Sequence, residues 1–487
     1  MSPQRAAAGA RRRRTKIIAT LGPATDSPEV MRRLIAAGVD VVRVNFSHGE
    51  TSELERRAAM VRELASEAGR HVGILGDLQG PKLRIARFAS GEVALAEGDD
   101  FVLDPDRDAG SGDGGGVGLS YRGLAADVGP GDVLLLDDGQ LELDVVAVDG
   151  LRVHTRVRTG GVLKNNKGLN RLGGGLSATA LTDKDREDIR TAARLDMDFV
   201  AVSFVRDAAD LEEARHLLRE AGSNALVVAK IERAEAVRDL APLIQASDVI
   251  MVARGDLGVE VGYAELPGLQ KRLLRETRGR NRIAITATQM MESMITSPIP
   301  TRAEVSDVAN AVMDGTDAVM LSAETAVGRY PVQAVEAMGE VCTAAEKHQT
   351  QRGRTNHRMD DIFAHVDEAI AMAVMYTANH LRVQAIIALT ESGSTARWMS
   401  RIRSDIPIYA FTRHEATARR VTLYRGVYPM QFETTHTESA LIYRAVFDKL
   451  LARDYVSEGD LVIITKGDTH GVSGRTNAMK ILEVTRD

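Results

Sequence analysis

The sequence predicts an α/β protein: a closed (β/α)8 TIM barrel, a small all-β cap domain inserted into it, and a C-terminal α/β domain. Three observations predict this architecture. Eight short apolar segments alternate with helical patterns, one long interruption shows two-residue periodicity, and the alternation restarts after about residue 350. An open doubly wound sheet is the alternative that the alternation alone leaves open.

The barrel prediction comes from near-continuous apolar runs, which are typical of parallel strands buried on both faces. These runs cover residues 16–20, 41–46, 73–78, 199–204, 226–230, 249–253, 283–288 and 318–323. Apolar residues at helical spacing lie between most of them. These helical patterns cover residues 29–37, 52–67, 183–194, 207–220 and 302–313. Eight strands that alternate with helices match the number in a closed barrel.

The interruption between residues 78 and 199 is too long for a single helical crossover. Residues 151–157 alternate strictly between apolar and polar, as half-buried strands do. We therefore expect a β-barrel cap domain at 81–169, which leaves 1–80 and 170–347 for the catalytic barrel. The Gly-rich stretch 110–118 is interpreted as a hairpin tip, because no Lys-Ser/Thr pair of a phosphate loop follows it.

The third domain is expected at 348–487, beginning with a polar linker over 348–358. A helix is predicted at 367–380. Strands are predicted at 385–389, 408–411, 461–465 and 479–484. This pattern indicates a separate α/β domain.

Composition excludes several classes of protein. With 62 Lys and Arg against 68 Asp and Glu, and 4% aromatic residues, we expect no nucleic-acid partner. No apolar run approaches the roughly 20 residues of a membrane span, so no membrane partner is expected. The first 14 residues lack the apolar core of a secretory signal, and Cys342 is the single cysteine, so we expect a cytoplasmic protein. The basic run 11–14 is interpreted as a solvated terminus rather than a phosphate-binding arm.

Polar residues gather at the predicted C-terminal strand ends, where barrel enzymes carry their functional groups. They are Arg43, Asn45, Ser47, Asp77, Lys230, Glu232, Asp256, Thr288 and Glu324. Taken singly, Lys230 and Glu232 could form an internal salt bridge, and Arg43 could be a core arginine satisfied by Asp77. The coincidence of two cations and several carboxylates at neighbouring strand ends favours metal-assisted phosphoryl or carboxylate chemistry.

A divalent-ion site is predicted from hard oxygen ligands on neighbouring strands. Glu232 and Asp256 would hold Mg²⁺ or Mn²⁺ and leave positions open for substrate and water. Asp256 lies between Gly255 and Gly258, in a turn where backbone N–H groups could approach an anion.

Seven segments resemble the pyruvate kinase family, in its order and spacing and nearly from end to end. They are Thr15-Lys-Ile-Ile-Ala-Thr-Leu-Gly-Pro-Ala24, Arg43-Val-Asn-Phe-Ser-His-Gly49, Asp77-Leu-Gln-Gly-Pro-Lys-Leu-Arg84, Val227-Val-Ala-Lys-Ile-Glu-Arg233, Met251-Val-Ala-Arg-Gly-Asp-Leu-Gly-Val-Glu260, Ala287-Thr-Gln-Met-Met-Glu-Ser-Met294 and Asp317-Ala-Val-Met-Leu-Ser-Ala-Glu-Thr325. The resemblance implies transfer of a phosphoryl group from phosphoenolpyruvate to ADP, which gives pyruvate and ATP in the last step of glycolysis. It also implies an allosteric homotetramer.

The resemblance also implies roles for individual residues. Lys230 would stabilise the phosphoryl group in flight, and Arg43 would contact the phosphate of phosphoenolpyruvate. The backbone of Gly255 and Asp256, together with Thr288, would hold the substrate carboxylate, and the enolate would be protonated near Thr288. Residues expected to bind the nucleotide are Asn45, His48, Arg84 and Lys167.

The chain departs from the family pattern in two places. The segment after Lys167 lacks the prolines that are usual there. K⁺-dependent members carry Thr and Glu where this chain has Leu78 and Lys82, whereas Asn45, Ser47 and Asp77 of the monovalent-ion pocket are present. We therefore expect Lys82 to take the place of the ion, so that K⁺ is not required.

An effector site is expected in the C-terminal domain, where a loop leaves a strand and opens a helix. Its residues are Thr390, Ser392, Gly393, Ser394 and Thr395, and a phosphorylated effector is the predicted partner. A plain helix-capping loop is the alternative. For the whole protein, the alternatives are an aldol-type lyase acting on pyruvate or phosphoenolpyruvate and a catalytically silent metabolite sensor.

Overall fold

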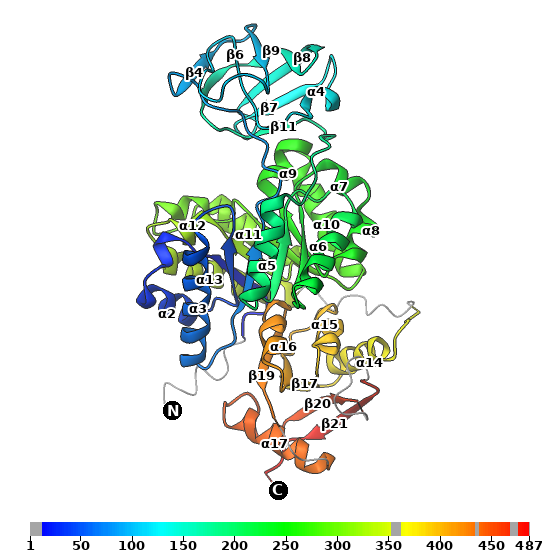
Figure 1. The fold of residues 1–487 in the computed structure, drawn as a ribbon. Coiled ribbons are helices and arrows are strands. Elements are labelled where there is room, and N and C mark those ends of the chain that lie inside the picture. Colours follow the sequence, from blue (N-terminus) through cyan, green and yellow to red (C-terminus); the bar gives the residue numbers. More distant parts are fainter. Residues whose placement is uncertain (1–11, 352–361, 434–437, 468–475, 487) are drawn as a thin grey trace.

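A computed structural model describes residues 12–351, 362–433, 438–467 and 476–486 of the chain (Figure 1). It contains a closed barrel of eight parallel strands in the order β1-β16-β15-β14-β13-β12-β3-β2. The strands are β1 (Lys16–Thr20), β2 (Val41–Asn45), β3 (Gly73–Asp77), β12 (Phe199–Val202), β13 (Leu226–Ile231), β14 (Val249–Ala253), β15 (Ile283–Ala287) and β16 (Ala318–Leu321). All eight predicted strands are confirmed, and the closed order rules out the open sheet.

Helices surround the barrel and bury the outward faces of its strands. They are α2 (Pro28–Ala37), α3 (Thr51–Glu67), α5 (Asp183–Arg194), α6 (Ala208–Glu220), α7 (Ala234–Arg238), α8 (Leu240–Ala246), α9 (Arg254–Val261), α10 (Leu266–Gly279), α11 (Arg302–Asp314), α12 (Ala323–Ala326) and α13 (Pro331–Gln351). Short 3₁₀ turns lie at η1 (Pro23–Thr25) and η2 (Glu292–Ile295). Residues such as Ile17, Val200 and Leu273 form the core between strands and helices.

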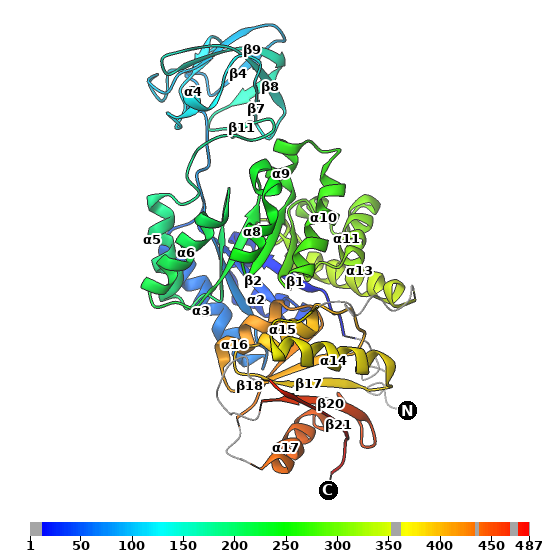
Figure 2. The same cartoon turned by 90° about the vertical axis from the view of Figure 1, so that its right-hand side faces the viewer.

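The inserted domain stands at one end of the barrel, connected to it by two segments of chain (Figure 1, Figure 2). Its elements are β4 (Glu92–Leu95), β5 (Asp100–Leu103), β6 (Gly116–Val117), α4 (Leu124–Asp127), β7 (Val133–Leu136), β8 (Leu141–Asp149), β9 (Arg152–Thr159), β10 (Gly161–Lys164) and β11 (Leu169–Arg171). It has a core of its own, centred on Phe101, Leu134 and Leu143. Because β11 pairs with β7 as far as Arg171, the cap sheet extends two residues past the expected boundary at 169.

The C-terminal domain lies at the opposite end of the barrel, around a five-stranded sheet ordered β19-β18-β17-β20-β21 (Figure 2). Its strands are β17 (Ala385–Leu389), β18 (Ile408–Thr412), β19 (Val427–Gln431), β20 (Leu461–Lys466) and β21 (Ala478–Glu483). Its helical elements are α14 (Val366–His380), α15 (Ser394–Ser400), α16 (Glu415–Arg420), η3 (Val421–Leu423) and α17 (Ser439–Leu451). The four predicted strands are confirmed. Strand β19 was not predicted. It contains Pro429 and forms an edge of the sheet, where proline is tolerated.

Two expectations about chain ends and linkers need correction. The helix α13 extends to Gln351, past the expected boundary at 347, and residues 352–358 of the expected linker lie outside the described residues. Arg13 and Arg14 do not form a solvated tail: Arg13 pairs with Asp40 at 2.9 Å, and Arg14 pairs with Asp405 of the C-terminal domain at 2.5 Å. Arg11 is outside the described residues.

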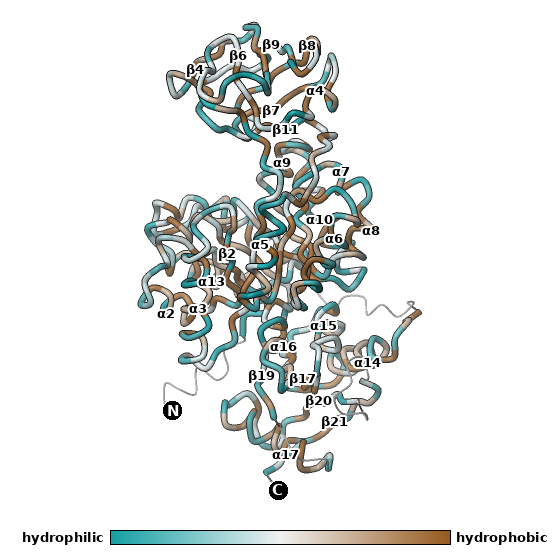
Figure 3. Tube along the Cα trace, viewed as in Figure 1, coloured by the Kyte–Doolittle hydropathy of each residue, from teal (hydrophilic) through white to brown (hydrophobic). Residues whose placement is uncertain are grey.

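Hydropathy along the chain agrees with this architecture, since the barrel strands and the central strands of the other sheets are hydrophobic (Figure 3). In the described part of the chain, no helix combines the length and the apolar character that crossing a membrane requires.

Candidate active site

The polar residues predicted at the strand ends lie at or just after the C-terminal ends of the barrel strands, and the chain passes from one of these ends, that of β3, into the cap. Strand register explains how they meet. Asn45 on β2 lies opposite Asp77 on β3, and Asp77 lies opposite Ala201 on β12. Strand β12 pairs in turn with β13, which carries Lys230 near its end. Four neighbouring strands thus place these residues on one rim.

Asp77 is the centre of a buried ionic network. Its carboxylate accepts a hydrogen bond from Arg43 Nε at 2.6 Å and lies 3.3 Å from the ammonium of Lys230. Arg43 Nη1 also donates to Thr20 Oγ1 at 3.2 Å. Burial alone would raise the pKa of Asp77, but Lys230 and Arg43 hold it below its usual value. An ionised Asp77 therefore fixes both cations side by side.

Lys230 contacts three oxygen-bearing side chains. Its Nζ donates to Ser203 Oγ at 2.6 Å and lies 2.8 Å from Glu232 Oε1, in addition to its contact with Asp77. Burial disfavours the charged form, yet the two carboxylates outweigh that effect and raise the pKa of Lys230. Lys230 is therefore a fixed cation at neutral pH. The internal salt bridge considered from the sequence exists, and it lies within the polar cluster.

Glu232 and Asp256 form the candidate metal pair. Glu232 is 2% exposed, and its Oε2 accepts a hydrogen bond from the backbone N–H of Phe204 at 2.8 Å. Asp256 lies in the first turn of α9. Burial and the nearby charge of Asp256 raise the pKa of Glu232, although Lys230 acts in the opposite direction. This repulsion between two carboxylates is what a bound cation would relieve.

The described residues contain no cluster of three or more His, Cys, Asp or Glu side chains that could hold a metal ion. A divalent ion at Glu232 and Asp256 would therefore take its other oxygen ligands from substrate and water, which suits the open coordination that Mg²⁺ sites commonly have.

The start of α9 is tied to the end of β15. The backbone N–H of Gly255 donates to Thr288 Oγ1 at 2.8 Å, and Thr288 Oγ1 donates to the carbonyl of Ala287 at 2.7 Å. Thr288 and Gln289 both have positive φ, at 65° and 52°. Such strained backbone persists only where its surroundings enforce it. Here Arg254 does so, donating from Nη2 to the carbonyls of Thr288 at 2.7 Å and Gln289 at 3.0 Å.

Two residues expected to bind the nucleotide lie on neighbouring segments of the cap. Arg84 forms an isolated antiparallel bridge with Gly168, next to Lys167. The ammonium of Lys167 pairs with Asp137 at 2.7 Å. On the barrel rim, burial and the nearby charges of Lys82, Arg84 and Arg43 lower the pKa of His48. This pKa effect indicates an electropositive environment around His48, as polyphosphate binding requires.

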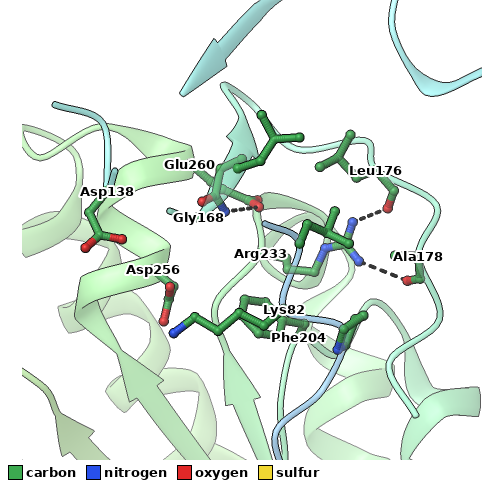
Figure 4. Close-up of a pocket in the computed structure, with 13 residues that line it drawn as sticks. Lys82, Asp138, Gly168, Leu176, Ala178, Phe204, Arg233, Asp256 and Glu260 are labelled. Carbon is green, nitrogen blue, oxygen red and sulfur yellow. Dashed lines mark hydrogen bonds between the residues drawn. The ribbon is translucent and has the colours of Figure 1, made fainter. Parts of the chain in front are cut away.

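A pocket of about 480 Å³ lies between the cap and the barrel (Figure 4). Its lining includes Lys82, Asn170, Arg233, Asp256 and Glu260. Figure 4 shows the Lys82 side chain reaching toward Asp256. Arg233 donates to backbone carbonyls of the segment that returns from the cap, so it holds this segment against the barrel.

The residues of the expected monovalent-ion pocket have other partners. Asn45 Oδ1 accepts a hydrogen bond from the backbone N–H of Ser47 at 3.1 Å, and Asp77 is engaged by Arg43 and Lys230. Lys82 is exposed and makes no ion pair with any carboxylate in the described part of the chain. Its ammonium is therefore available to a substrate.

The expected effector loop joins β17 to α15. Gly393 has a φ of 83°, and its N–H donates to Thr390 Oγ1 at 2.9 Å. Thr395 is buried, and its hydroxyl is hydrogen-bonded to Thr476 at 2.6 Å. Of the five predicted residues, Thr390 and Gly393 are thus bonded to each other within the loop, and Thr395 is bonded to a residue outside it.

Three residues that hold the site together were missed by the sequence analysis: Ser203, Arg254 and Glu260. Ser203 follows β12, so the strand-end rule could have found it. Arg254 directly precedes Gly255, which was a predicted site residue. Its contacts with residues 287–289, however, depend on the pairing of β14 with β15, which the sequence does not reveal. Glu260 is 3% exposed and accepts a hydrogen bond from the Ala234 N–H at 2.9 Å. No local signal in the sequence reveals that contact.

Comparisons with known proteins agree with this geometry. The family model described as "Pyruvate kinase, barrel domain" matches residues 12–335, and "Pyruvate kinase, alpha/beta domain" matches residues 368–482. The chain is 56% identical to pyruvate kinase II of Salmonella typhimurium, over 97% of this chain and 99% of that protein. It is 54% identical to a pyruvate kinase of Haemophilus influenzae, over 94% and 96%. It is 42% identical to a pyruvate kinase of Geobacillus stearothermophilus, over 96% and 80%.

Proposed function

The chain belongs to the pyruvate kinase family, a family of phosphotransferases that move a phosphoryl group between phosphoenolpyruvate and ADP, and we propose how its own residues perform this transfer. The observation that carries the proposal is the convergence of Arg43 and Lys230 on the buried carboxylate of Asp77. Two cations held in place before substrate arrives need no reorganisation when negative charge develops between them.

In this proposal, Arg43 binds the phosphate of phosphoenolpyruvate and Lys230 faces the phosphoryl group as it moves. Phosphoryl transfer leaves little covalent chemistry for the protein, so positioning and charge stabilisation dominate. Lys230 is suited to this role because Ser203 and two carboxylates fix its ammonium, so that its position does not depend on the substrate.

The substrate carboxylate is proposed to bind at the start of α9. The N–H groups of Gly255 and Asp256 belong to the first turn of that helix, where an anion is favoured. The Gly255 N–H now donates to Thr288 Oγ1, and we propose that a substrate carboxylate takes over as the acceptor. This exchange frees a lone pair of Thr288 Oγ1 to accept a hydrogen bond from a water near carbon three of the enolate. Donation of the Thr288 proton itself would also require the hydroxyl to leave the Ala287 carbonyl.

The family uses a divalent metal ion, and we propose that Glu232 and Asp256 hold Mg²⁺ or Mn²⁺. The charges at the site fit this assignment. Arg43 and Lys230 contribute two positive charges, while Asp77, Glu232 and Asp256 contribute three negative charges when all are ionised. A divalent cation reverses this excess of negative charge, which would otherwise oppose binding of a phosphate. When bound, such an ion neutralises charge on the transferring group.

The nucleotide is proposed to bind between the barrel rim and the cap. Asn45 and His48 would contact it from the rim, and Arg84 and Lys167 from the cap. Lys167 would have to exchange its pairing with Asp137 for a phosphate oxygen. Closure of the cap over ADP would bring these cations to the phosphates.

We propose that Lys82 replaces a monovalent ion, so that K⁺ is not required. Its ammonium is exposed, lies in the pocket beside Asp256, and makes no ion pair with a described carboxylate. A tethered positive charge there would contribute to phosphate binding and repel free K⁺. Activity in tetramethylammonium buffer, where no alkali ion is present, should therefore be nearly unchanged when K⁺ is added. Strong activation by K⁺ would refute this assignment. Lys82→Glu combined with Leu78→Thr should create a K⁺ requirement.

The remaining properties are proposed from the family resemblance: a glycolytic role, a homotetramer, a cytoplasmic location and activation by a phosphorylated effector at residues 390–395. The hydroxyls of Ser392 and Ser394 would contact the effector phosphate. The nearby Glu391 adds a negative charge that its pairing with Arg413 at 3.2 Å partly offsets. If Ser392→Asp combined with Ser394→Asp leaves activation by sugar phosphates and AMP unchanged, the effector does not bind there.

The test of the whole proposal is formation of pyruvate and ATP from phosphoenolpyruvate and ADP, with Mg²⁺ and K⁺ varied separately. An aldol-type lyase would consume substrate without making ATP, and a silent sensor would bind metabolites without turnover. Phosphoenolpyruvate-dependent ATP formation that disappears in Lys230→Met supports the proposal. Undiminished formation in that variant would refute it.

A further inference from the structure

A second cavity is lined by residues of both the barrel and the C-terminal domain. These two domains meet at the end of the barrel opposite the cap (Figure 2). The space that the cavity encloses, together with adjoining space open to solvent, is about 510 Å³. The ionisable residues that line it are Arg14, Arg278, Arg401, Arg403, Arg425 and Asp317. Five arginines thus surround the cavity with a single carboxylate, an unusual concentration of one charge at a boundary between domains.

Three of these arginines have carboxylate partners. Arg401, almost completely buried, forms a two-pronged pair with Asp317. Arg14 pairs with Asp405 at 2.5 Å, and Arg425 lies 3.9 Å from Glu346. These pairs are structural because they hold the C-terminal domain against the barrel. Asp317, Asp405 and Glu346 are the carboxylates in the described part of the chain that form ion pairs with the lining arginines.

Arg278 and Arg403 are different. Within the described part of the chain, the side chain of Arg278 makes no hydrogen bond or ion pair, although it is partly buried near the end of α10. Arg403 donates only to backbone carbonyls, at 3.2 Å to Met313 and 3.5 Å to Asp314, and its buried Nε has no partner. Both side chains are partly buried, and a guanidinium withdrawn from water without a carboxylate in ion-pair contact is costly.

The two guanidinium groups converge on one point, above Gly315. A Cβ atom placed on Gly315 would lie 2.5 Å from Arg278 Nη1 and 3.2 Å from Arg403 Nη2. The absence of a side chain at Gly315 therefore makes room for both groups. Burial and the charges of Arg403 and Arg401 lower the pKa of Arg278 to about 10, which shows that the local field disfavours its charge.

We propose that this cavity binds a small dianion with tetrahedral oxygens, such as inorganic phosphate or the phosphate of a monoester, between Arg278 and Arg403. Guanidinium groups match phosphate oxygens in pairs, and two unpaired groups balance two negative charges.

This site is distinct from the effector loop discussed above, because the two lie at opposite ends of α15. The loop precedes Ser394, the first residue of α15, whereas Ser400 and Arg401 at its other end line the cavity. A bound dianion would connect α10 of the barrel with the C-terminal domain and replace repulsion between arginines by attraction.

The test uses the full-length protein and inorganic phosphate as the probe, at constant ionic strength with chloride as the reference anion. Equilibrium dialysis with labelled phosphate counts the sites on each chain. We expect Arg278→Gln to bind one phosphate per chain fewer than the unsubstituted protein, because phosphate bound at the active site or the effector loop is unaffected. The control is Arg275→Gln, an exposed arginine one turn earlier on α10, which should keep the full count.

Thermal unfolding provides an independent readout. Phosphate should raise the midpoint of the unsubstituted protein more than that of Arg278→Gln, by roughly 1–3 °C at ten times the dissociation constant. Arg403→Gln should also lack this phosphate-induced rise in the unfolding midpoint. It provides a second test if Arg278→Gln folds poorly. A ribose or hexose phosphate that displaces labelled phosphate from this site would identify a monoester as the ligand; otherwise the site takes free phosphate. Equal phosphate counts in Arg278→Gln, Arg403→Gln and the unsubstituted protein would overturn the proposal.

Discussion

Lys230→Met removes the cation that faces the transferring phosphoryl group and preserves much of the length of its side chain. The ammonium has contacts at 2.6 Å with Ser203, 2.8 Å with Glu232 and 3.3 Å with Asp77, and methionine can replace none of them. Loss of one preorganised charge-stabilising group costs about 10²–10³ in kcat. Because Lys230 is also a full positive charge, we expect a loss of kcat at or above the upper end of this range.

The structure adds a stability cost that the sequence does not suggest. From the sequence alone, the fold of Lys230→Met is expected to stay intact. In the structure, the substitution leaves Glu232 buried at 2% exposure without its cation, while Asp77 retains Arg43. Removing one partner of a buried ion pair typically costs about 3–5 kcal/mol of the free energy of unfolding. Protonation of Glu232 would reduce that cost.

This cost should depend on pH in a defined direction. Burial already raises the pKa of Glu232, and removing Lys230 raises it further. A carboxyl whose pKa is higher in the folded state binds more protons there, so folding loses stability as pH rises through that pKa. The stability difference between Lys230→Met and the unsubstituted protein should therefore be smaller at pH 5 than at pH 8.

The assay couples pyruvate formation to NADH oxidation, and urea unfolding at pH 5 and pH 8 measures the free energy. The control is Lys164→Met, which breaks an exposed pair with Glu92 at 4.0 Å and should cost at most about 1 kcal/mol with normal activity. Near-normal ATP production by Lys230→Met would remove this residue from the mechanism. A stability loss equal to that of the control would contradict the buried network.

Three further predictions concern the surrounding residues. Glu232→Gln should raise the Mg²⁺ or Mn²⁺ concentration for half-maximal activity by about tenfold or more, since an anionic oxygen ligand is lost; unchanged metal dependence would exclude Glu232 as a ligand. Arg254→Met should lower kcat/KM for phosphoenolpyruvate by about 10–100-fold by releasing Thr288, with little change in KM for ADP; equal effects on both substrates would indicate general damage. Burial raises the pKa of Glu260 to about 7. The free energy of unfolding of the unsubstituted protein should therefore fall by up to about 3 kcal/mol relative to that of Glu260→Gln as pH rises from 4.5 to 7.5. The same pH dependence of unfolding in both proteins would contradict this burial effect.

The barrel was predictable because its signal is local. Each strand is a short apolar run that is buried on both faces, so composition and length alone identify it, as with β14 at Val249–Ala253. Strand β19 escaped detection because Pro429 breaks such a run, and only its position at a sheet edge makes the proline acceptable. The ion pairs of Arg13 and Arg14 could not be predicted because their partners, Asp40 and Asp405, are remote in sequence.

The residues of the candidate site could be predicted because the ends of the barrel strands can be located in the sequence. The strand-end rule identified Arg43, Asp77 and Lys230, but it could not show that Arg43 and Lys230 share the carboxylate of Asp77. Their contact depends on the register of β2, β3, β12 and β13, which is set by closure of the barrel. The unpaired Arg278 was invisible for a stronger reason, because whether a partner is missing depends on every neighbouring side chain.

The network around Asp77 also explains why a site for an anionic substrate can be built from carboxylates. Asp77 lowers the cost of keeping Arg43 and Lys230 buried and charged, since each cation has an ionised partner before substrate binds. Glu232 and Asp256 then leave an excess of negative charge that a divalent ion can reverse. Positive charge is thus held ready without net repulsion in the free protein, and its full effect appears only when the metal ion and the phosphoryl group are both present.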